Sequence, residues 1–412
     1  MTRQNLTAIK ALTFVMFMMF AMTTDSVGII IPEIIRTFHL SLTAAGSFQY
    51  ATMSGIGLAG FLLGHLADSL GRKQAIVTGL TLFAAASYLF IAGSSFWYFC
   101  ALMALSGAAI GIFKTAALAL IGDIVTSTKE HTSIMNTVEG FFGVGSIIGP
   151  AILARLLIRG LSWQWLYVIA GTMCVLLIIT ASSVGYPAAK SAGAPKSYAI
   201  SAFTNPYILA FSLGAFLYVA VESAVYVWMP TLIAGYHGNA AWVAAYSISI
   251  FFLLRAAGRF LGSWMLNRFQ WTGVLGLCSA LILACFAVSV AGGVAWAIWL
   301  LPLSGLFMSV IYPTINSKGI SCLPKPEHGA GAGVILFFTC LSAVLAPLAM
   351  GAISDSMGGP GYGFVLATGF AAVLFAGLTL NWIFNPTLRL FRQIDETQYN
   401  FAITEGVTNE TP

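Results

Sequence analysis

Charged side chains are scarce in this sequence. Only 8% of the 412 residues are Asp, Glu, Lys or Arg, whereas 59% are hydrophobic. A soluble globular chain carries about 25% charged residues. The net charge of +5 belongs to no basic soluble segment, so we expect no nucleic-acid partner. This composition excludes an ordinary soluble domain and indicates a chain built for the lipid bilayer.

Several kinds of catalytic and metal-binding pattern are also missing. The six cysteines show no paired spacing, and the five histidines lie at loops or run ends without metal spacing, so disulfides and metal sites are not expected. No nucleophile motif and no phosphate-binding glycine loop is present. We therefore expect neither an enzyme nor an ATP-driven pump, and no cofactor other than a proton as coupling ion.

What the sequence does contain is a series of apolar runs, each long enough to cross a hydrocarbon core. The first run is too long for a signal peptide and is expected to be retained. The predicted fold is an all-α membrane protein with twelve transmembrane helices, at about residues 9–36, 44–66, 74–94, 97–124, 132–158, 163–183, 207–234, 241–266, 272–291, 294–319, 330–354 and 362–385.

The basic residues predict the orientation of these spans. With the N-terminus inside, twelve Lys and Arg residues fall on the cytoplasmic side, three fall outside and three lie within spans. Because loops rich in Lys and Arg stay in the cytoplasm, we expect a multi-pass protein of the inner (cell) membrane with both termini cytoplasmic.

A repeat divides the chain into halves. Residues 185–203, rich in Pro, Gly, Ser and Lys, read as a cytoplasmic linker between two six-helix bundles at residues 1–184 and 204–388, with a cytoplasmic tail at 389–412. Parallel repeats of this kind build transporters whose site lies at the repeat interface. The matching positions are separated by 197 or 198 residues: Pro32 and Pro230, Gly60 and Gly258, Gly64 and Gly262, Ser106 and Ser304, Pro150 and Pro347.

Residues 60–73 form the most informative stretch. Gly64, Asp68, Gly71, Arg72 and Lys73 follow the spacing G-x-L-A-D-x-x-G-R-K between two apolar runs. Glycines permit close helix approach and a sharp turn, and Asp68 can accept hydrogen bonds from Arg72 or from the next helix N-terminus. The stretch resembles the signature loop between the second and third helices of the major facilitator superfamily. The resemblance implies a conformational gating role for these five residues.

Five ionisable residues lie inside spans: Asp25, Lys114, Glu139, Glu222 and Arg255. An intramembrane charge is costly and should face the bundle interior. All five occur on helices that line the cavity in the fold implied by the signature loop, and the spans expected at the periphery have none in their apolar interiors.

The second half resembles the fucose:proton symporter family through residues 216–219 with Glu222, residues 258–262 and residues 307–314. Around Pro32, Lys114 and Asn136 the first half matches more loosely. The resemblance implies uptake of a small sugar with a proton. The family carries a carboxylate in the place of Lys114, and its first-span carboxylate sits one turn later than Asp25. Lys114 can instead hold an anionic substrate or keep Asp25 ionised.

Each charge has a structural alternative. Asp25, Glu139 and Glu222 are the predicted proton-coupling residues, but Asp25 can equally form a permanent ion pair with Lys114, and Glu139 a structural pair. Arg255 can bind substrate or Glu222. The predicted substrate-binding residues are Lys114, Glu222, Arg255, Tyr218, Tyr226, Gln49, Tyr50, Asn136, Tyr312 and Asn316, of which Tyr218, Glu222 and Tyr226 share one helix face at i, i+4 and i+8.

We interpret the chain as a proton-coupled, alternating-access transporter of a small polar solute, a sugar or sugar acid, acting as a monomer in the bilayer. One alternative is a proton-driven drug or metabolite exporter, although Ala104 stands where such exporters often carry arginine. An alternative of another class is a membrane sensor that binds a solute without moving it.

Overall fold

The computed structural model describes residues 3–40, 47–187, 202–233 and 236–399. Within these ranges all regular secondary structure is helical, which confirms the predicted all-α class. A chain in lipid must satisfy its backbone N–H and C=O groups internally, and a helix does so within one segment. Most of the predicted linker (residues 188–201) and the end of the predicted tail (400–412) lie outside the described residues.

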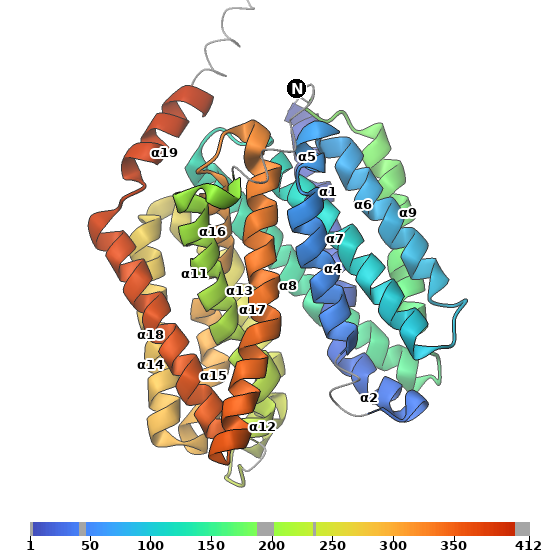
Figure 1. Cartoon of the computed structure of the whole chain (residues 1–412), viewed down its shortest axis with the longest axis vertical. Coiled ribbons are helices and arrows are strands. Elements are labelled where there is room, and N and C mark those ends of the chain that lie inside the picture. The colour runs from blue at the N-terminus through green and yellow to red at the C-terminus, as the bar shows by residue number, and fades with distance from the viewer. Residues whose placement is uncertain (1–2, 41–46, 188–201, 234–235, 400–412) are drawn as a thin grey trace, which may run out of the picture. The chain divides into compact units, whose positions relative to one another are not determined.

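The helices run in two series (Figure 1). The first sequence half contains α1 (Arg3–Thr24), α2 (Val27–Phe38), α4 (Ser47–Leu63), α5 (Leu66–Ser69), α6 (Arg72–Leu89), α7 (Phe96–Ile124), α8 (Thr128–Ile158) and α9 (Gln164–Ser183). The second half contains α11 (Pro206–Ser223), the π-helix η1 (Ala224–Trp228), α12 (Met229–Ile233), α13 (Ala241–Arg268), α14 (Trp271–Gly292), α15 (Val294–Met308), α16 (Ile311–Ile320), η2 (Lys325–Glu327), α17 (His328–Met357), α18 (Pro360–Phe384), α19 (Leu388–Ile394) and η3 (Asp395–Tyr399).

Ten helical segments in the described part of the chain are long and apolar enough to cross a membrane. The two further spans predicted from the sequence correspond to α4 and α6. Helix α4 has 17 residues, and residues 41–46 before it lie outside the described part of the chain. Helix α6 has 18 residues but begins with Arg72, Lys73 and Gln74, which lower its mean hydropathy.

Three predicted spans are interrupted rather than continuous. The first divides into α1 and α2 around Asp25 and Ser26. The seventh changes from α-helix to π-helix directly after Ser223, and the tenth breaks at Ser309 and Val310 between α15 and α16. Interrupted helices expose backbone groups inside a membrane bundle, and transporters commonly place their sites there.

Contacts between Cα atoms group the chain into two units. The first contains residues 1–124, 138–205 and 326–341, and the second contains 125–137, 206–325 and 342–412. Helices α8 and α17 therefore each contribute to both units. The bundle boundaries predicted from the repeat, residues 1–184 and 204–388, stay a prediction.

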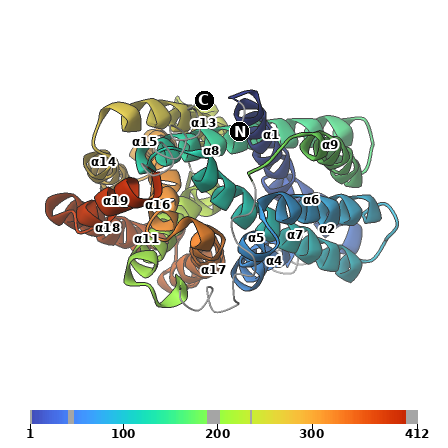
Figure 2. The same cartoon turned by 90° about the horizontal axis from the view of Figure 1, so that it is seen from above.

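The first unit packs α4 against α7, and α6 against both α7 and α9. The view along the helices shows α6 and α7 as neighbours (Figure 2). At Gly107 a Cβ atom would overlap the backbone oxygen of Thr52, so glycine is what lets α7 approach α4. At one end, aromatic rings fill the space between helices, with Phe90 stacked 4.1 Å from Tyr167.

The second unit repeats this packing. At Gly305 of α15, a Cβ atom would lie 2.6 Å from the backbone oxygen of Phe251 in α13. Gly305 follows Gly107 by 198 positions, so equivalent glycines bring equivalent helix pairs together. This supports the duplication inferred from the sequence.

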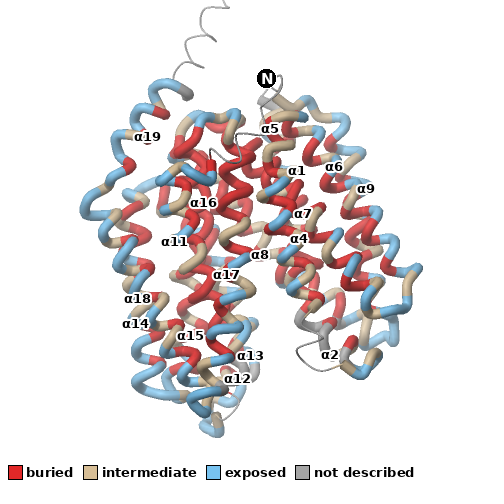
Figure 3. The backbone as a smooth tube through the Cα atoms, in the orientation of Figure 1, coloured by how far each residue is buried: buried red, intermediate tan, exposed pale blue. Residues whose placement is uncertain are grey.

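Helices α9, α14 and α18 carry stretches of exposed residues (Figure 3), and these include large aliphatic residues. Leu176 and Ile179 on α9 are 59% and 61% exposed, and Leu277 on α14 is 57% exposed. Exposed apolar side chains on long helices suit contact with lipid. These helices correspond to the sixth, ninth and twelfth predicted spans, three of the four that were expected at the periphery.

Candidate functional site

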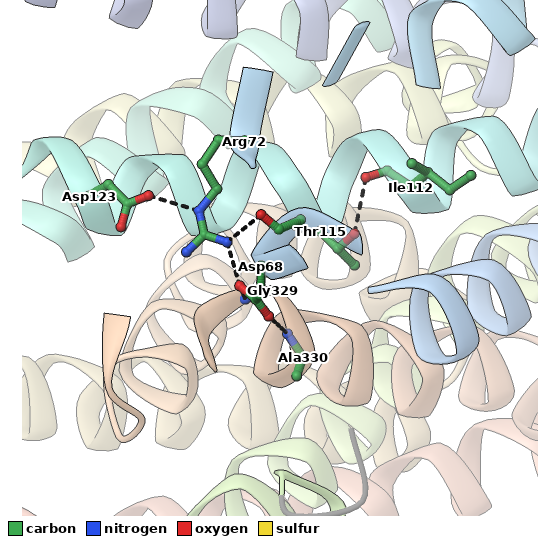
Figure 4. Close-up of polar contacts among 8 residues, drawn as sticks. Asp68, Arg72, Ile112, Thr115, Asp123, Gly329 and Ala330 are labelled. Atoms are coloured by element: carbon green, nitrogen blue, oxygen red, sulfur yellow. Dashed lines mark hydrogen bonds and ion pairs between the residues drawn. The ribbon is translucent and has the colours of Figure 1, made fainter. Parts of the chain in front are cut away.

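The signature loop folds into a buried ionic network (Figure 4). Asp68 in α5 is 3% exposed and forms an ion pair with Arg72. The Nε atom of Arg72 also lies 2.8 Å from Asp123 of α7. The predicted contact between Asp68 and Arg72 is therefore present, and Asp123 is a second partner that sequence reasoning missed.

Asp68 also binds a helix N-terminus, but not the one that follows it in sequence. The N–H groups of Gly329 and Ala330 at the start of α17 donate to Asp68 at 3.2 and 3.1 Å. The prediction named the next helix, α6, as the alternative partner; the helix N-terminus that Asp68 binds belongs instead to α17. A carboxylate there offsets the unpaired N–H groups and the positive end of the helix dipole.

Burial is the main influence on the ionisation of Asp68, which lies between membrane-crossing helices. It raises the pKa of this carboxyl from 3.8 to about 6, against the opposing effects of Arg72 and the two α17 N–H groups. Asp68 is consequently a group whose charge changes near physiological pH when α5 and α17 are in contact.

The other members of the signature loop have structural tasks. Gly71 takes a φ of 94°, a conformation that favours glycine. At Gly64 a Cβ atom would lie 2.9 Å from the backbone oxygen of Gly329, so this glycine permits the contact with α17. Lys73 donates to the carbonyl oxygens of Ser182 and Val184 at 2.9 and 3.1 Å.

A first cluster of polar residues lies in the first unit around the break between α1 and α2. The Ser146 hydroxyl of α8 donates to Asp25. The Thr24 hydroxyl donates to the other carboxylate oxygen of Asp25 at 3.3 Å. Asp25 thus sits where the helix is interrupted and is held by hydroxyl groups rather than by a cation.

Lys114 of α7 belongs to the same cluster. Its Nζ atom lies 4.8 Å from the ring centroid of Phe142 and 5.9 Å from that of Phe17. Among the described residues it forms no ion pair with a carboxylate. The permanent ion pair between Asp25 and Lys114, weighed as an alternative from the sequence, is therefore absent.

The remaining predicted residues of the first half are more dispersed. Glu139 lies on α8 and is 3% exposed. Gln49 and Tyr50 lie in the first turn of α4, where Tyr50 is 37% exposed. No hydrogen bond recorded for the described residues joins Gln49 or Tyr50 to the first cluster.

A second cluster lies in the second unit beside the π-helix. Arg255 of α13 places Nε 2.9 Å from Glu222 of α11. The Tyr218 hydroxyl donates to the same carboxylate oxygen at 2.6 Å, and the Tyr218 ring stacks 6.0 Å from Tyr312 of α16. Four of the predicted substrate-binding residues therefore meet at one place.

Tyr226 lies in η1, where a π-helix replaces the α-helix and carries more residues per turn. The predicted shared face of Tyr218, Glu222 and Tyr226 assumed a continuous α-helix. The structure has that α-helix from Tyr218 to Glu222, and the helical period changes between Glu222 and Tyr226. The place of Tyr226 on this face stays a prediction.

Asn136 and Asn316 are buried at a helix contact. The Asn136 amide donates to the Thr132 carbonyl oxygen at 2.9 Å and to the Thr314 hydroxyl of α16 at 3.3 Å. Asn316 of α16 is 2% exposed. Nearby, Ser317 lies 2.7 Å from His131, a histidine to which no role was assigned from the sequence. This set attaches the first turns of α8 to α16.

The segment after α18 is attached to the same end of α8. Asp395 accepts hydrogen bonds from the backbone N–H and the hydroxyl of Thr128 at 3.0 and 3.2 Å. Lys318 donates to the Thr128 carbonyl oxygen at 3.3 Å and lies 4.9 Å from the ring centroid of Phe391. Part of the predicted tail is thus helical and packed.

Several functional contacts carried little sequence signal. Ser146 stands in a run of small residues and Phe142 in an apolar run, so neither suggested a polar contact. Asp123 lies at the end of an apolar run, and its negative charge could have suggested it as a partner for Arg72. The break at Asp25 was visible only as a short polar stretch, Thr23–Ser26.

Comparisons with known proteins match nearly the whole chain. The family model for the Major Facilitator Superfamily matches residues 13–347. Protein TsgA of Escherichia coli O157:H7 is 26% identical over 373 residues, covering 88% of this chain and 93% of TsgA.

Two solved structures share the fold. The E. coli fucose:proton symporter FucP has a TM-score of 0.76 at 21% identity, over 90% of this chain and 98% of FucP. The proton:xylose symporter XylE has a TM-score of 0.73 at 11% identity, over 94% of this chain and 97% of XylE.

Proposed function

Because the chain belongs to the Major Facilitator Superfamily, we propose that it is a secondary transporter that moves a small polar solute, a sugar or sugar acid, together with a proton. The chain is a multi-pass membrane protein and not an enzyme by family. Within this proposal it acts in the inner membrane, with both termini in the cytoplasm, as a monomer that needs no cofactor.

One observation supports the proposal most strongly. Each half places a carboxylate where an equivalent helix is interrupted: Asp25 lies at the break between α1 and α2, and Glu222 lies two residues before η1 begins at Ala224. The two carboxylates are 197 positions apart, the offset of the repeat. A charged group inside a membrane is retained when function requires it.

The partners of these carboxylates suit proton transfer. Ser146 and Thr24 donate to ionised Asp25, and hydroxyl groups can also accept a hydrogen bond once the acid is protonated. Arg255 forms an ion pair with Glu222. Protonation of Glu222 would weaken this ion pair, which links proton uptake to the contact between α11 and α13.

The second cluster also has the chemistry of a sugar site. The Tyr218 and Tyr312 rings lie beside a carboxylate and a guanidinium. Rings pack on the apolar faces of a sugar, and charged groups bind its hydroxyls. FucP and XylE, the fucose:proton and proton:xylose symporters that share the fold, agree with this class of solute.

The signature loop supplies a gate in this proposal. Asp68 holds the N-terminus of α17 through Gly329 and Ala330, and Arg72 ties Asp68 to α7 through Asp123. Alternating access requires contacts of this kind to form in one state and break in the other. Burial in this contact raises the pKa of Asp68 to about 6, so the contact is more stable with Asp68 protonated, and the strength of the gate depends on pH.

The test is uptake into proteoliposomes containing the purified protein, with an imposed pH gradient. We expect an acidic exterior to drive accumulation of the solute. Asp25→Asn and Glu222→Gln should each abolish accumulation yet leave some solute exchange at equal pH, because exchange needs no net proton movement. Glu396→Gln, at an exposed position of η3, is the matched control and should behave as the unaltered protein. Uptake that ignores both pH and membrane potential would contradict proton coupling.

A further inference from the structure

Lys114 carries a positive charge beside the first cluster and forms no ion pair with any carboxylate in the part of the chain that the structure describes. It lies in the middle of α7, a helix of 29 residues with an apolar sequence around it. Its ammonium lies beside the rings of Phe17 and Phe142. Lys114 is half-buried, so part of its side chain is accessible.

Helix α8 donates a hydrogen bond to Asp25, the carboxylate that the sequence suggested as the counter-ion of Lys114. Ser146 binds Asp25, and Phe142, one turn earlier on the same helix, contacts Lys114 through its ring. The Ser146 hydroxyl also lies 3.1 Å from the Phe142 carbonyl oxygen. The negative and positive side chains are thus attached to successive turns of α8, each by a neutral group.

Neutral rings alone are weak compensation for this charge. Contact with an aromatic face stabilises an ammonium by less than it costs to place a lysine at the centre of a membrane helix. A cation that is accessible, stabilised from its sides by rings and lacking an anion has the features of a receptor for an anion.

We propose that the solute carries a carboxylate group and that Lys114 binds it, so that the substrate is a sugar acid or a related hydroxy acid rather than a neutral sugar. This inference rests on the proposed transport function and names the substrate class of that site. Phe17 and Phe142 position the ammonium and exclude water from the ion pair.

The charge balance follows from this assignment. A monovalent acid anion that enters with one proton moves no net charge, whereas a neutral sugar with one proton moves one positive charge. Uptake of the acid should therefore follow the pH gradient and be insensitive to membrane potential at this stoichiometry.

The experiment uses matched pairs that differ only in the acid group, D-glucuronate with D-glucose and D-galacturonate with D-galactose. Thermal stabilisation of the purified protein reports binding, and proteoliposome uptake reports transport. We expect the acids to bind and the neutral sugars to bind at least tenfold more weakly. Lys114→Gln should weaken binding of the acid by about 10- to 100-fold, the range for a lost charged hydrogen bond, and Lys114→Arg should restore most of it.

Lys129→Gln is the control, because Lys129 is exposed near the start of α8 and should leave binding unchanged. Preference of the unaltered protein for the neutral member of each pair would overturn the inference even if Lys114→Gln fails to fold. Equal binding by the unaltered protein and a well-folded Lys114→Gln variant would also overturn it. Proton-driven uptake of a neutral sugar would overturn the inference about Lys114 and leave the proposed function intact. Uptake of an acid that does not depend on pH would refute proton coupling and support the assignment of Lys114.

Discussion

Replacing Asp68 with alanine should release the N-terminus of α17 from the signature loop. The substitution removes the acceptor of the Gly329 and Ala330 N–H groups and one of two carboxylates that pair with Arg72, whose side chain is 8% exposed. Breaking a buried ion pair costs about 3–5 kcal/mol.

The lower end of that range applies here. Asp123 still pairs with Arg72 in the variant, and the raised pKa of Asp68, about 6, means that burial already disfavours its charge. A loss of about 3 kcal/mol corresponds to a local opening that is roughly 100-fold more frequent.

Hydrogen exchange of the amides at Gly329 and Ala330 measures this opening directly. Asp68→Ala should raise their exchange about 100-fold. Asp123→Ala is the matched control, since Asp123 contacts Arg72 but not these amides, and it should change their exchange by less than about tenfold. Unchanged protection in Asp68→Ala, or an equal effect in both variants, would refute the gate assignment.

Three further outcomes are expected. Because the pKa of Asp68 in contact with α17 is about 6 and its ordinary value is 3.8, the contact state binds more protons between these values. The stability of this contact should therefore fall as pH rises from about 4 to 6 and level off above pH ~6. Hydrogen-exchange protection of the Gly329 and Ala330 amides, corrected for intrinsic exchange rates, measures this change. Asp68→Asn should remove the pH dependence. Gly107→Ala should lower the melting temperature through a clash with α4 worth about 1–3 kcal/mol, whereas Gly369→Ala, with open space around it, should not; equal melting temperatures would contradict the packing. Asp395→Ala should destabilise by about 1 kcal/mol, because Thr128 loses its acceptor; an unchanged melting temperature would show that the tail contact contributes nothing.

Local sequence patterns predicted the helices and the ionic pair in the signature loop. Apolar runs set the spans, and a spacing of four residues placed Asp68 near Arg72. The partners at Gly329 and Ala330 are more than 250 positions away. Such contacts depend on how helices from both sequence halves pack, which one sequence does not display.

The second cluster was partly predictable for a different reason. Glu222 and Arg255 are both charged inside apolar spans, and each is costly without the other, so their pairing followed from energetics. The π-helix that contains Tyr226 was not predictable, because its residues Ala224–Trp228 contain neither glycine nor proline. In an α-helix the N–H of residue 230 would donate to the carbonyl oxygen of Tyr226, but Pro230 has no N–H. The missing hydrogen bond is a reason for the π-helix, and hydrophobic periodicity does not reveal it.

The most direct test of the account is to measure solute and proton fluxes together in proteoliposomes, with a pH-sensitive dye inside and a labelled hexuronate outside. The account predicts that the solute enters with protons and that Asp25→Asn or Glu222→Gln abolishes proton entry while solute exchange persists. Solute entry without any proton flux in the unaltered protein would contradict it.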